Sequence, residues 1–268
     1  MRIYAGADIL TTNTGGPKML IMPTQDKLRS LRLHGMLKAL EEQDNDHSAY
    51  TDLDFQDRLG LLVDRELTER DNRRLATRLR TARFRQAACL EDLDYSARRG
   101  LDKNVIKKLS TGQWINDRLN ILITGPCGAG KSYIAEALAH KGCVLGHSAF
   151  NIRTPAIFND LAMAKGDGQY KKLMRLLTRT EILVIDDWGL SKLTDDQRQD
   201  LLEIIDARHN TGSTIVTSQL PVKHWHEVIG SATIADAILD RLVHNAYSIE
   251  IEPGVDSMRK ASGKKRLQ

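Results

Sequence analysis

The sequence contains few aromatic residues and few cysteines. Only 5% of its 268 residues are Phe, Trp or Tyr, so aliphatic side chains must fill most of any core, which the 41% hydrophobic content allows. Its three cysteines are an odd number without metal-ligand spacing, which argues against a disulfide scaffold and indicates reduced thiols. The sequence has no run of about 18 apolar residues and no basic segment followed by a short apolar run. We therefore expect no transmembrane helix, no secretory signal, a cytoplasmic location and no membrane partner.

The charge of the whole chain is mildly basic, with a formal net charge of +4 and an isoelectric point near 8.9. Such a balance does not by itself establish a nucleic-acid partner. The length suits one large domain or two modest ones. From changes in composition we predict a disordered leader over 1–18, a helical N-terminal domain over 19–95, an α/β domain over 96–259 and a basic tail over 260–268.

A glycine-rich segment matches the pattern of a phosphate-binding loop, Gly125-Pro126-Cys127-Gly128-Ala129-Gly130-Lys131-Ser132. The apolar run 120–124 before it predicts a buried strand, and residues 133–140 after it predict a helix, which is the context that this motif requires. Its glycines let backbone N–H groups converge on an anion, and the helix N-terminus adds partial positive charge. We predict that the segment binds ATP, with Lys131 at the β- and γ-phosphates and the Ser132 hydroxyl on Mg²⁺. The alternative, a glycine turn that binds nothing, is disfavoured by the flanking strand and helix.

A second apolar run, 181–185, ends in the two carboxylates Asp186 and Asp187. A continuous apolar run is typical of a strand that is covered on both faces of a parallel sheet, and ligands of such sheets bind at the carboxyl ends of the strands. We predict that Asp186 ligates Mg²⁺ and that Asp187 orients or deprotonates the attacking water. The alternative is that both acids cap the next element.

The N-terminal region has a helical pattern. One helix is predicted to begin at Pro23, with Leu28, Leu31, Leu37 and Leu40 on its apolar side, and to end before 44–48. A longer helix is predicted over 54–85. Its expected inner side consists of Phe55, Leu59, Leu62, Leu75 and Leu79.

This longer helix is rich in arginine. Nine arginines stand between residues 58 and 85 beside four acids, and no acid occurs within 72–85. Arginine without acidic partners suits phosphate contact, so we predict a DNA-backbone role. The predicted contacts are Arg73, Arg74, Arg78, Arg80 and Arg83. The alternative is a solvated face of ion pairs one helical turn apart.

The rest of the chain alternates between strand and helix patterns. Strands are predicted at 148–152, 181–187, 213–217 and 247–251, and helices at 158–165, 170–178, 195–209 and 232–245. This alternation predicts a three-layer α/β domain with a parallel sheet, preceded by a small all-α N-terminal domain.

With these pieces in order, residues 19–260 resemble the IstB-like helper ATPases of bacterial insertion sequences, members of the AAA+ class near the replication-initiator and helicase-loader branch. The phosphate loop is generic to many ATPases, whereas the segments 183–189 and 237–246 are more specific. The matching segments are Leu33 to Met36, Leu90 to Asp94, Gly125 to Ser132, Leu183 to Gly189, Ala237 to Ala246 and Ser257 to Lys260.

The resemblance implies further roles. Ser218 or Gln219, with Gln219 favoured, is implied to be the polar sensor of the γ-phosphate, and Arg241 to be the arginine finger that acts on a neighbouring subunit's nucleotide. Arg259 is implied to be the second sensor arginine. The segment 158–179 is implied to face DNA, and the basic residues that suit this role are Lys165, Lys171, Lys172 and Arg175. The implied partners are double-stranded DNA, a cognate transposase and further copies of the chain.

Two departures from the AAA+ pattern bear on activity. AAA+ ATPases usually carry Glu where Asp187 stands, and the shorter side chain suggests slow turnover. Fewer than fifty residues follow Gln219, which leaves little room for a helical lid and puts the role of Arg259 in doubt.

Three other functions stay open on the sequence alone. A replicative-helicase loader of the same branch shares the ATPase core, and a nucleotide-binding architectural protein would hydrolyse almost nothing. A small-molecule phosphate-loop kinase is disfavoured by the arginine-rich helix and the segment 237–246.

Overall fold

The computed structural model of the chain describes residues 18–95 and 100–252. The chain forms two compact units, Met1–Arg74 and Leu75–Gln268. The division falls inside a helix rather than at the predicted 95/96 boundary, because Leu75 and Leu79 pack into the core of the second unit. The predicted leader apart from Lys18, the predicted tail and Arg259 lie outside the described residues.

The first unit is helical. Its elements are α1 (Lys18–Ser30), α2 (His34–Asn45), the short 3₁₀ helix η1 (His47–Tyr50) and the beginning of α3 (Phe55–Ala82). The single helix predicted from Pro23 onward is therefore wrong, since two helices cover that stretch and Pro23 lies inside the first one.

A C-terminal capping turn separates α1 from α2. The Leu33 amide donates to the Leu28 carbonyl at 2.9 Å and the Arg32 amide to Arg29 at 3.0 Å, the bond pattern of a Schellman motif. The left-handed position in this turn is filled by Arg32, with φ of 59°. Glycine usually takes this position, so the sequence carried no signal for the break.

The N-terminus of α2 docks against α3 through a buried carboxylate. Glu66 accepts hydrogen bonds from the Gly35 amide at 2.7 Å and the Met36 amide at 3.2 Å, and from Arg70 Nε at 2.7 Å. A Cβ on Gly35 would lie 2.5 Å from the Glu66 Cα, so only glycine allows this approach. Burial opposes ionisation of Glu66, but these hydrogen bonds and the Arg70 charge lower its pKa overall.

The predicted inner side of α3 is only partly correct. Leu75 and Leu79 are partly buried against the core, whereas Phe55 is 66% exposed and Leu59 is 36% exposed. The helical pattern predicts one apolar side along the whole helix. In the structure, Glu66 makes a buried contact in the first half of α3, whereas apolar side chains pack against the core in its last turns.

The second unit is built on a parallel sheet of five strands in the order β2-β3-β4-β1-β5. The strands are β1 (Asn120–Thr124), β2 (Ala149–Arg153), β3 (Ile182–Trp188), β4 (Ser213–Ser218) and β5 (Ala246–Glu250). The helical elements are η2 (Leu90–Asp92), α4 (Lys103–Ser110), α5 (Gln113–Asn116), α6 (Lys131–Val144), α7 (Thr154–Gly166), α8 (Tyr170–Arg179), α9 (Asp195–Arg208), η4 (Val222–His224), α10 (Trp225–Ile229) and α11 (Ala232–Val243).

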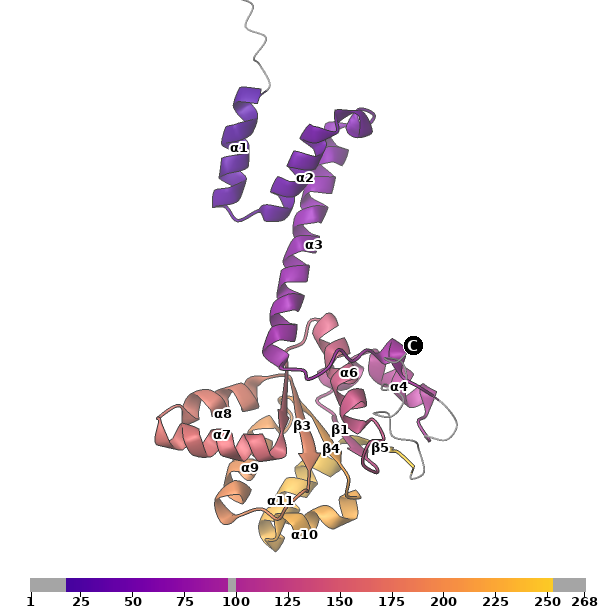
Figure 1. Ribbon diagram of the computed structural model, residues 1–268, viewed down its shortest axis with the longest axis vertical. Helices are drawn as coiled ribbons and strands as arrows, with labels where there is room; N and C mark the ends of the chain where they lie inside the picture. The colour runs from indigo at the N-terminus through magenta and orange to yellow at the C-terminus, as the bar shows by residue number, and fades with distance from the viewer. Residues whose placement is uncertain (1–17, 96–99, 253–268) are drawn as a thin grey trace, which may run out of the picture. The chain divides into compact units, whose positions relative to one another are not determined.

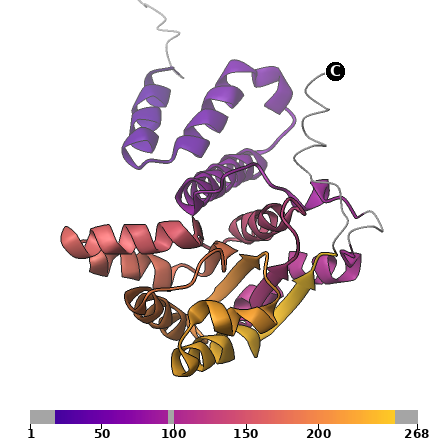
Figure 2. The same ribbon diagram turned by 60° about the horizontal axis from the view of Figure 1, so that its bottom comes forward.

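Helices cover both faces of this sheet (Figures 1 and 2). Along β1, Ile121 and Ile123 belong to the core that α4, α5 and α6 cover, while Leu122 belongs to the core beneath α7, α9 and α11. Alternation of buried side chains onto two faces is what a three-layer fold requires of its central strands. The predicted three-layer α/β class with a parallel sheet and a helical N-terminal region is confirmed.

All five strands point the same way, so their carboxyl ends share one edge of the sheet. Thr124 at the end of β1 pairs with Ser218 at the end of β4, and Arg153 at the end of β2 pairs with Asp186 in β3. The phosphate-loop motif follows β1 directly. The fold therefore brings the motif and the two aspartates to the same edge.

Candidate functional site

The loop between β1 and α6 has the backbone conformation of a phosphate cradle. Gly125, Gly128 and Gly130 have φ values of 150°, 79° and 92°, which side-chain-bearing residues rarely adopt. A Cβ on Gly125 would lie 2.7 Å from the Ile251 carbonyl oxygen, so glycine is also required there for space. Lys131 is the first residue of α6, a helix of 14 residues, so the loop ends at the N-terminus of this helix.

Lys131 is held inside this loop. Its ammonium donates to the Pro126 carbonyl at 2.8 Å, and the residue is only 7% exposed. Burial lowers the pKa of Lys131, while the nearby Cys127, Asp187 and Asp186 act in the opposite direction. A buried cation at the N-terminus of a helix, after a glycine-rich loop, is well placed to bind an anion.

Asp186 is the buried centre of a hydroxyl cluster. Its Oδ1 accepts from Ser132 Oγ at 2.7 Å and from Thr217 Oγ1 at 2.6 Å, and its side chain is 1% exposed. A carboxylate beside a serine hydroxyl at a phosphate loop is an oxygen donor set that suits Mg²⁺. The residues present therefore fit the metal, and Thr217 joins the predicted Ser132 and Asp186 as the group that orients the carboxylate.

Asp187 lies beside this cluster with a left-handed backbone, at φ of 58°. The register between β3 and β4 shifts between Ile185 and Trp188, so Asp187 occupies a bulge. Its amide donates to Thr217 Oγ1 at 3.1 Å, and its carboxylate binds Arg153 Nη2 at 2.6 Å. Arg153 therefore orients the side chain that the sequence assigns to water activation.

A cavity of about 430 Å³ opens over these groups. Lys131, Ser132, Asp187 and Gln219 line it. So does Arg85, which sequence reasoning counted as part of the arginine-rich helix although α3 ends at Ala82. No sequence signal marks Arg85, because its place in the cavity depends on the path of the chain after α3.

Residues 26–266 match the family model described as IstB-like ATP binding protein. The chain belongs to this family. An insertion sequence ATP-binding protein of Sinorhizobium fredii is 48% identical over 87% of this chain and 95% of its own length. A second relative, from an insertion sequence of Pseudomonas fluorescens, is 46% identical over 76% of this chain and 88% of its own length.

The fold of this IstB-like chain is also found among solved structures. The crystal structure of the DnaC helicase loader superposes with a TM-score of 0.52, at 18% sequence identity, and covers 63% of this chain and 99% of that chain. At this identity the likeness establishes the fold alone. The predicted family and the assignment as an ATPase are confirmed by the match to this ATP-binding family.

The two candidates for the polar sensor in the IstB-like chain, Ser218 and Gln219, differ in their surroundings. Ser218 is fully buried, where its hydroxyl donates to the Trp188 carbonyl at 2.9 Å and accepts from the Leu220 amide at 3.0 Å. Gln219 lines the cavity. Of the two, Gln219 is the residue placed to meet a nucleotide, and the sensor role stays a prediction.

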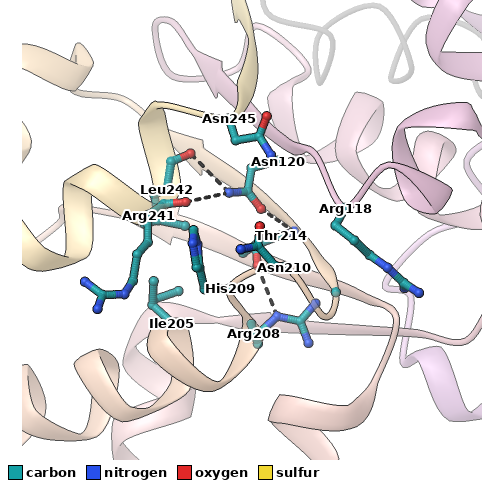
Figure 3. A pocket seen from close by; sticks show the side chains of 11 residues that line it. Arg118, Asn120, Ile205, Arg208, His209, Asn210, Thr214, Arg241, Leu242 and Asn245 are labelled. Carbon is teal, nitrogen blue, oxygen red and sulfur yellow. Dashed lines mark hydrogen bonds between the residues drawn. The ribbon is translucent and has the colours of Figure 1, made fainter.

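Arg241 lies on α11 just before β5, near the amino ends of the strands. Asn120 at the start of β1 holds the end of α11, because its Nδ2 donates to the carbonyls of Arg241 at 3.0 Å and Leu242 at 3.2 Å. The Arg241 guanidinium points away from Asn120 (Figure 3) and binds Asp206 at 2.8 Å. Arg241 is therefore not part of the cavity of its own chain, which a finger that acts on a neighbour requires.

The hollow that Figure 3 shows is not a ligand site. It lies between Asn120, Arg208 and Arg241 and holds about 10 Å³, room for about one water molecule. Arg208 is 2% exposed and donates to the carbonyls of Leu177 at 2.8 Å and Thr180 at 2.6 Å. Its guanidinium satisfies backbone acceptors, so its role is structural.

The predicted DNA contacts on α3 fall into two groups. Arg73 lies 3.7 Å from Glu69 and Arg74 lies 3.4 Å from Asp71, so the premise of arginines without acidic partners is wrong for these two. The partners stand just before the acid-free stretch, one helical turn away. In the second group, Arg78 is partly buried and Arg80 is exposed, while Arg83 lies just beyond the end of α3 and stacks 5.2 Å over the Phe150 ring.

The predicted contacts on α7 and α8 also differ among themselves. These helices form a hairpin, drawn in salmon in Figure 2. Lys165 binds Asp200 at 2.7 Å, which gives it a structural partner. Lys171, Lys172 and Arg175 are exposed on α8.

Among the described helices, none combines the length and apolar character needed to cross a bilayer.

Proposed function

We propose that this protein is a Mg²⁺-dependent ATPase that assembles with copies of itself on duplex DNA and assists the transposase of an insertion sequence. The observation that carries the proposal is the meeting of Lys131 and Ser132, at the head of α6, with the buried Asp186 of β3 in a chain of the IstB-like ATP-binding family. The relatives named for insertion sequences support the transposition context.

Each residue of the site has its own role in the proposed hydrolysis. Lys131 and the loop amides bind the phosphates, and Ser132 and Asp186 hold Mg²⁺. The metal, when bound, neutralises charge that develops on the phosphoryl oxygens. Asp187 accepts a proton from the attacking water or orients it, while Arg153 fixes the direction of the carboxylate.

Assembly follows from the position of Arg241. Because its guanidinium lies outside the cavity of its own chain, a second copy must supply the arginine that completes each site. Arg241 pairs with the exposed Asp206 at 2.8 Å. The phosphates of the neighbour's nucleotide therefore compete with Asp206 for the Arg241 guanidinium, and a solvent-accessible ion pair is weak.

Binding to DNA is proposed for the exposed cations of α3 and α8. Arg80, Lys171, Lys172 and Arg175 are exposed and suited to phosphate contact rather than to base recognition. Affinity carried by phosphate contacts depends steeply on salt and weakly on sequence.

The deciding experiment is electron microscopy of the purified protein with duplex DNA and a slowly hydrolysed ATP analogue, beside the Lys131→Ala variant. We expect ordered assemblies on DNA with the wild type and none with the variant, because the loss of Lys131 removes nucleotide binding. Assemblies that form equally well with Lys131→Ala, or a wild type that ignores DNA, would refute the proposal.

The DnaC likeness supports a helicase loader as the second candidate, since it covers the ATPase core. A pull-down with the transposase and with the replicative helicase separates the two. Retention of the transposase alone supports the first candidate, and retention of the helicase alone supports the second.

A further inference from the structure

The segment that follows α3 is fastened along one face of α6. The Phe84 ring lies 6.4 Å from the His140 ring, the Arg85 amide donates to Glu136 Oε1 at 3.2 Å, and the Cys89 amide donates to Tyr133 Oη at 3.3 Å. Because Tyr133, Glu136 and His140 are three and four residues apart, they share a face of the helix. The chain that leaves α3 thus runs along the helix that the phosphate loop opens.

The Arg85 side chain leaves this segment toward the metal-binding carboxylate. Its Nη1 lies 3.3 Å from Asp186 Oδ2, the oxygen that Ser132 and Thr217 do not use. The Arg85 side chain is 53% exposed, whereas that of Asp186 is 1% exposed. A guanidinium has five N–H donors and one carboxylate oxygen engages few of them, so Arg85 retains donors for a further anion.

The cavity offers few cations to the phosphates of a nucleotide. Among the described residues that line it, Lys131 and Arg85 are the cations, and Glu136 and Asp187 are the acids. A triphosphate carries more negative charge than Lys131 alone offsets. Guanidinium is the side chain best matched to phosphate oxygens, because its donors form a planar fork.

We propose that Arg85 binds the phosphates of the nucleotide in its own chain and thereby ties the segment after α3 to the nucleotide state. Asp186 engages only Nη1 of Arg85, so the remaining guanidinium donors can reach the phosphates whether or not the metal site is filled. Arg85 stands three residues beyond the end of α3 at Ala82, so this contact reaches the end of the arginine-rich helix directly. The inference rests on the proposed nucleotide site and adds a cation that the phosphate-loop motif does not include.

The first test is titration of a fluorescent ATP analogue in the presence of Mg²⁺. We expect Arg85→Gln to weaken binding about tenfold, the factor that corresponds to one hydrogen bond to a charged group, and Arg85→Lys to lose less. The control is Lys141→Gln, which removes a partly exposed cation from the same helix α6 and should bind like the wild type. Unchanged binding by Arg85→Gln would overturn the proposal.

A second titration separates phosphate contact from simple neutralisation of Asp186. In EDTA, Arg85→Gln is compared with the wild type both in the native background and beside Asp186→Asn. If Arg85 touches the phosphates, its loss weakens binding by a similar factor in both backgrounds. If Arg85 acts only by offsetting the Asp186 charge, Arg85→Gln does not weaken binding in the Asp186→Asn background, and the proposal fails.

The link to the segment is tested by amide hydrogen exchange of residues 84–90 with saturating nucleotide. We expect slower exchange with nucleotide in the wild type and no slowing in Arg85→Gln at equal occupancy. Equal slowing in both proteins would overturn the link. A wild type that binds no nucleotide at all would refute the proposed function itself, whereas normal binding with an inert Arg85 refutes this inference alone.

Discussion

At the residue scale, Asp187 combines a short side chain with a fixed direction. Its left-handed backbone, at φ of 58°, sits in the bulge of β3, and Arg153 binds its carboxylate. AAA+ enzymes usually reach the water with the longer glutamate, as the sequence comparison implied. The bulge and the ion pair hold the shorter acid at the cavity, where the proposed role in water activation requires it.

Replacement of Asp187 by Asn should separate binding from chemistry. The amide keeps the shape and the hydrogen-bonding oxygen but cannot accept the proton, so we expect nucleotide affinity within about threefold of wild type and hydrolysis lower by about 100-fold or more. Analogue titration and phosphate release measure the two quantities. Undiminished phosphate release would remove Asp187 from the reaction.

At the scale of elements, one buried carboxylate stands out among the contacts between α2 and α3. Glu66 caps the Gly35 and Met36 amides from across the helix pair, and the close approach at Gly35 leaves no room for a larger residue. The role resembles that of an N-cap, supplied here by a different helix.

Glu66→Gln should lower the free energy of unfolding by about 1 kcal/mol at neutral pH, a typical contribution of one capping interaction. Because the pKa of Glu66 is lowered in the folded state, its ionised form stabilises the protein above the usual pKa of 4.5, and this stability is lost as the pH falls through the folded pKa. Urea unfolding of both proteins at neutral and acidic pH measures the difference. A difference in the free energy of unfolding between the two proteins that stays the same at acidic pH would contradict the stabilising role of ionised Glu66.

The arginine-rich helix makes a prediction about salt. Arg78 and Arg80 lie in the acid-free turns of α3, whereas Arg73 and Arg74 have acidic neighbours. We expect Arg78→Ala with Arg80→Ala to reduce the slope of log affinity for duplex DNA against log salt by about 0.9 for each lost contact, and the matched pair Arg73→Ala with Arg74→Ala to reduce it less. Binding titrations at several salt concentrations give the slopes. Equal slopes in the wild type and both double variants would show that α3 makes no DNA contact and that its arginines form a solvated face of ion pairs.

At the scale of the whole molecule, the proposed nucleotide site and the proposed arginine finger lie in different places on one chain. Lys131 and Asp187 line the cavity at the carboxyl edge of the sheet, and Arg241 lies near the amino ends of the strands with Asp206. In the proposed assembly, each site is completed when copies of the chain stand side by side.

Mixing two inactive variants tests that arrangement. Lys131→Ala and Arg241→Ala should each hydrolyse ATP at least about 100-fold more slowly than wild type, since an arginine finger contributes about 10³–10⁵ in other nucleotidases. An equal mixture should recover part of the activity, because some interfaces pair an intact Lys131 with an intact Arg241. Phosphate release from the mixture measures this. Full activity of Arg241→Ala alone would exclude the finger.

The sequence predicted the second unit better than the first. β1 was predicted residue for residue, and the other strands within two residues at either end, because buried parallel strands are continuous apolar runs between glycine turns. The break at Arg32 was missed because a left-handed arginine replaces the usual glycine. The exposed Phe55 was assigned to the interior because a helical pattern does not say what lies opposite it.

By itself, the sequence determined the phosphate loop, the two aspartates after the apolar run and the parallel sheet that joins them, because spacing along a strand and a helix fixes which groups a local segment presents. Only the tertiary structure decided that Arg85 enters the cavity, that Thr217 holds Asp186, that Arg153 orients Asp187 and that Ser218 is turned into the core. Each of these depends on contacts between segments far apart in the chain, and the periodicity of one segment carries no information about the other.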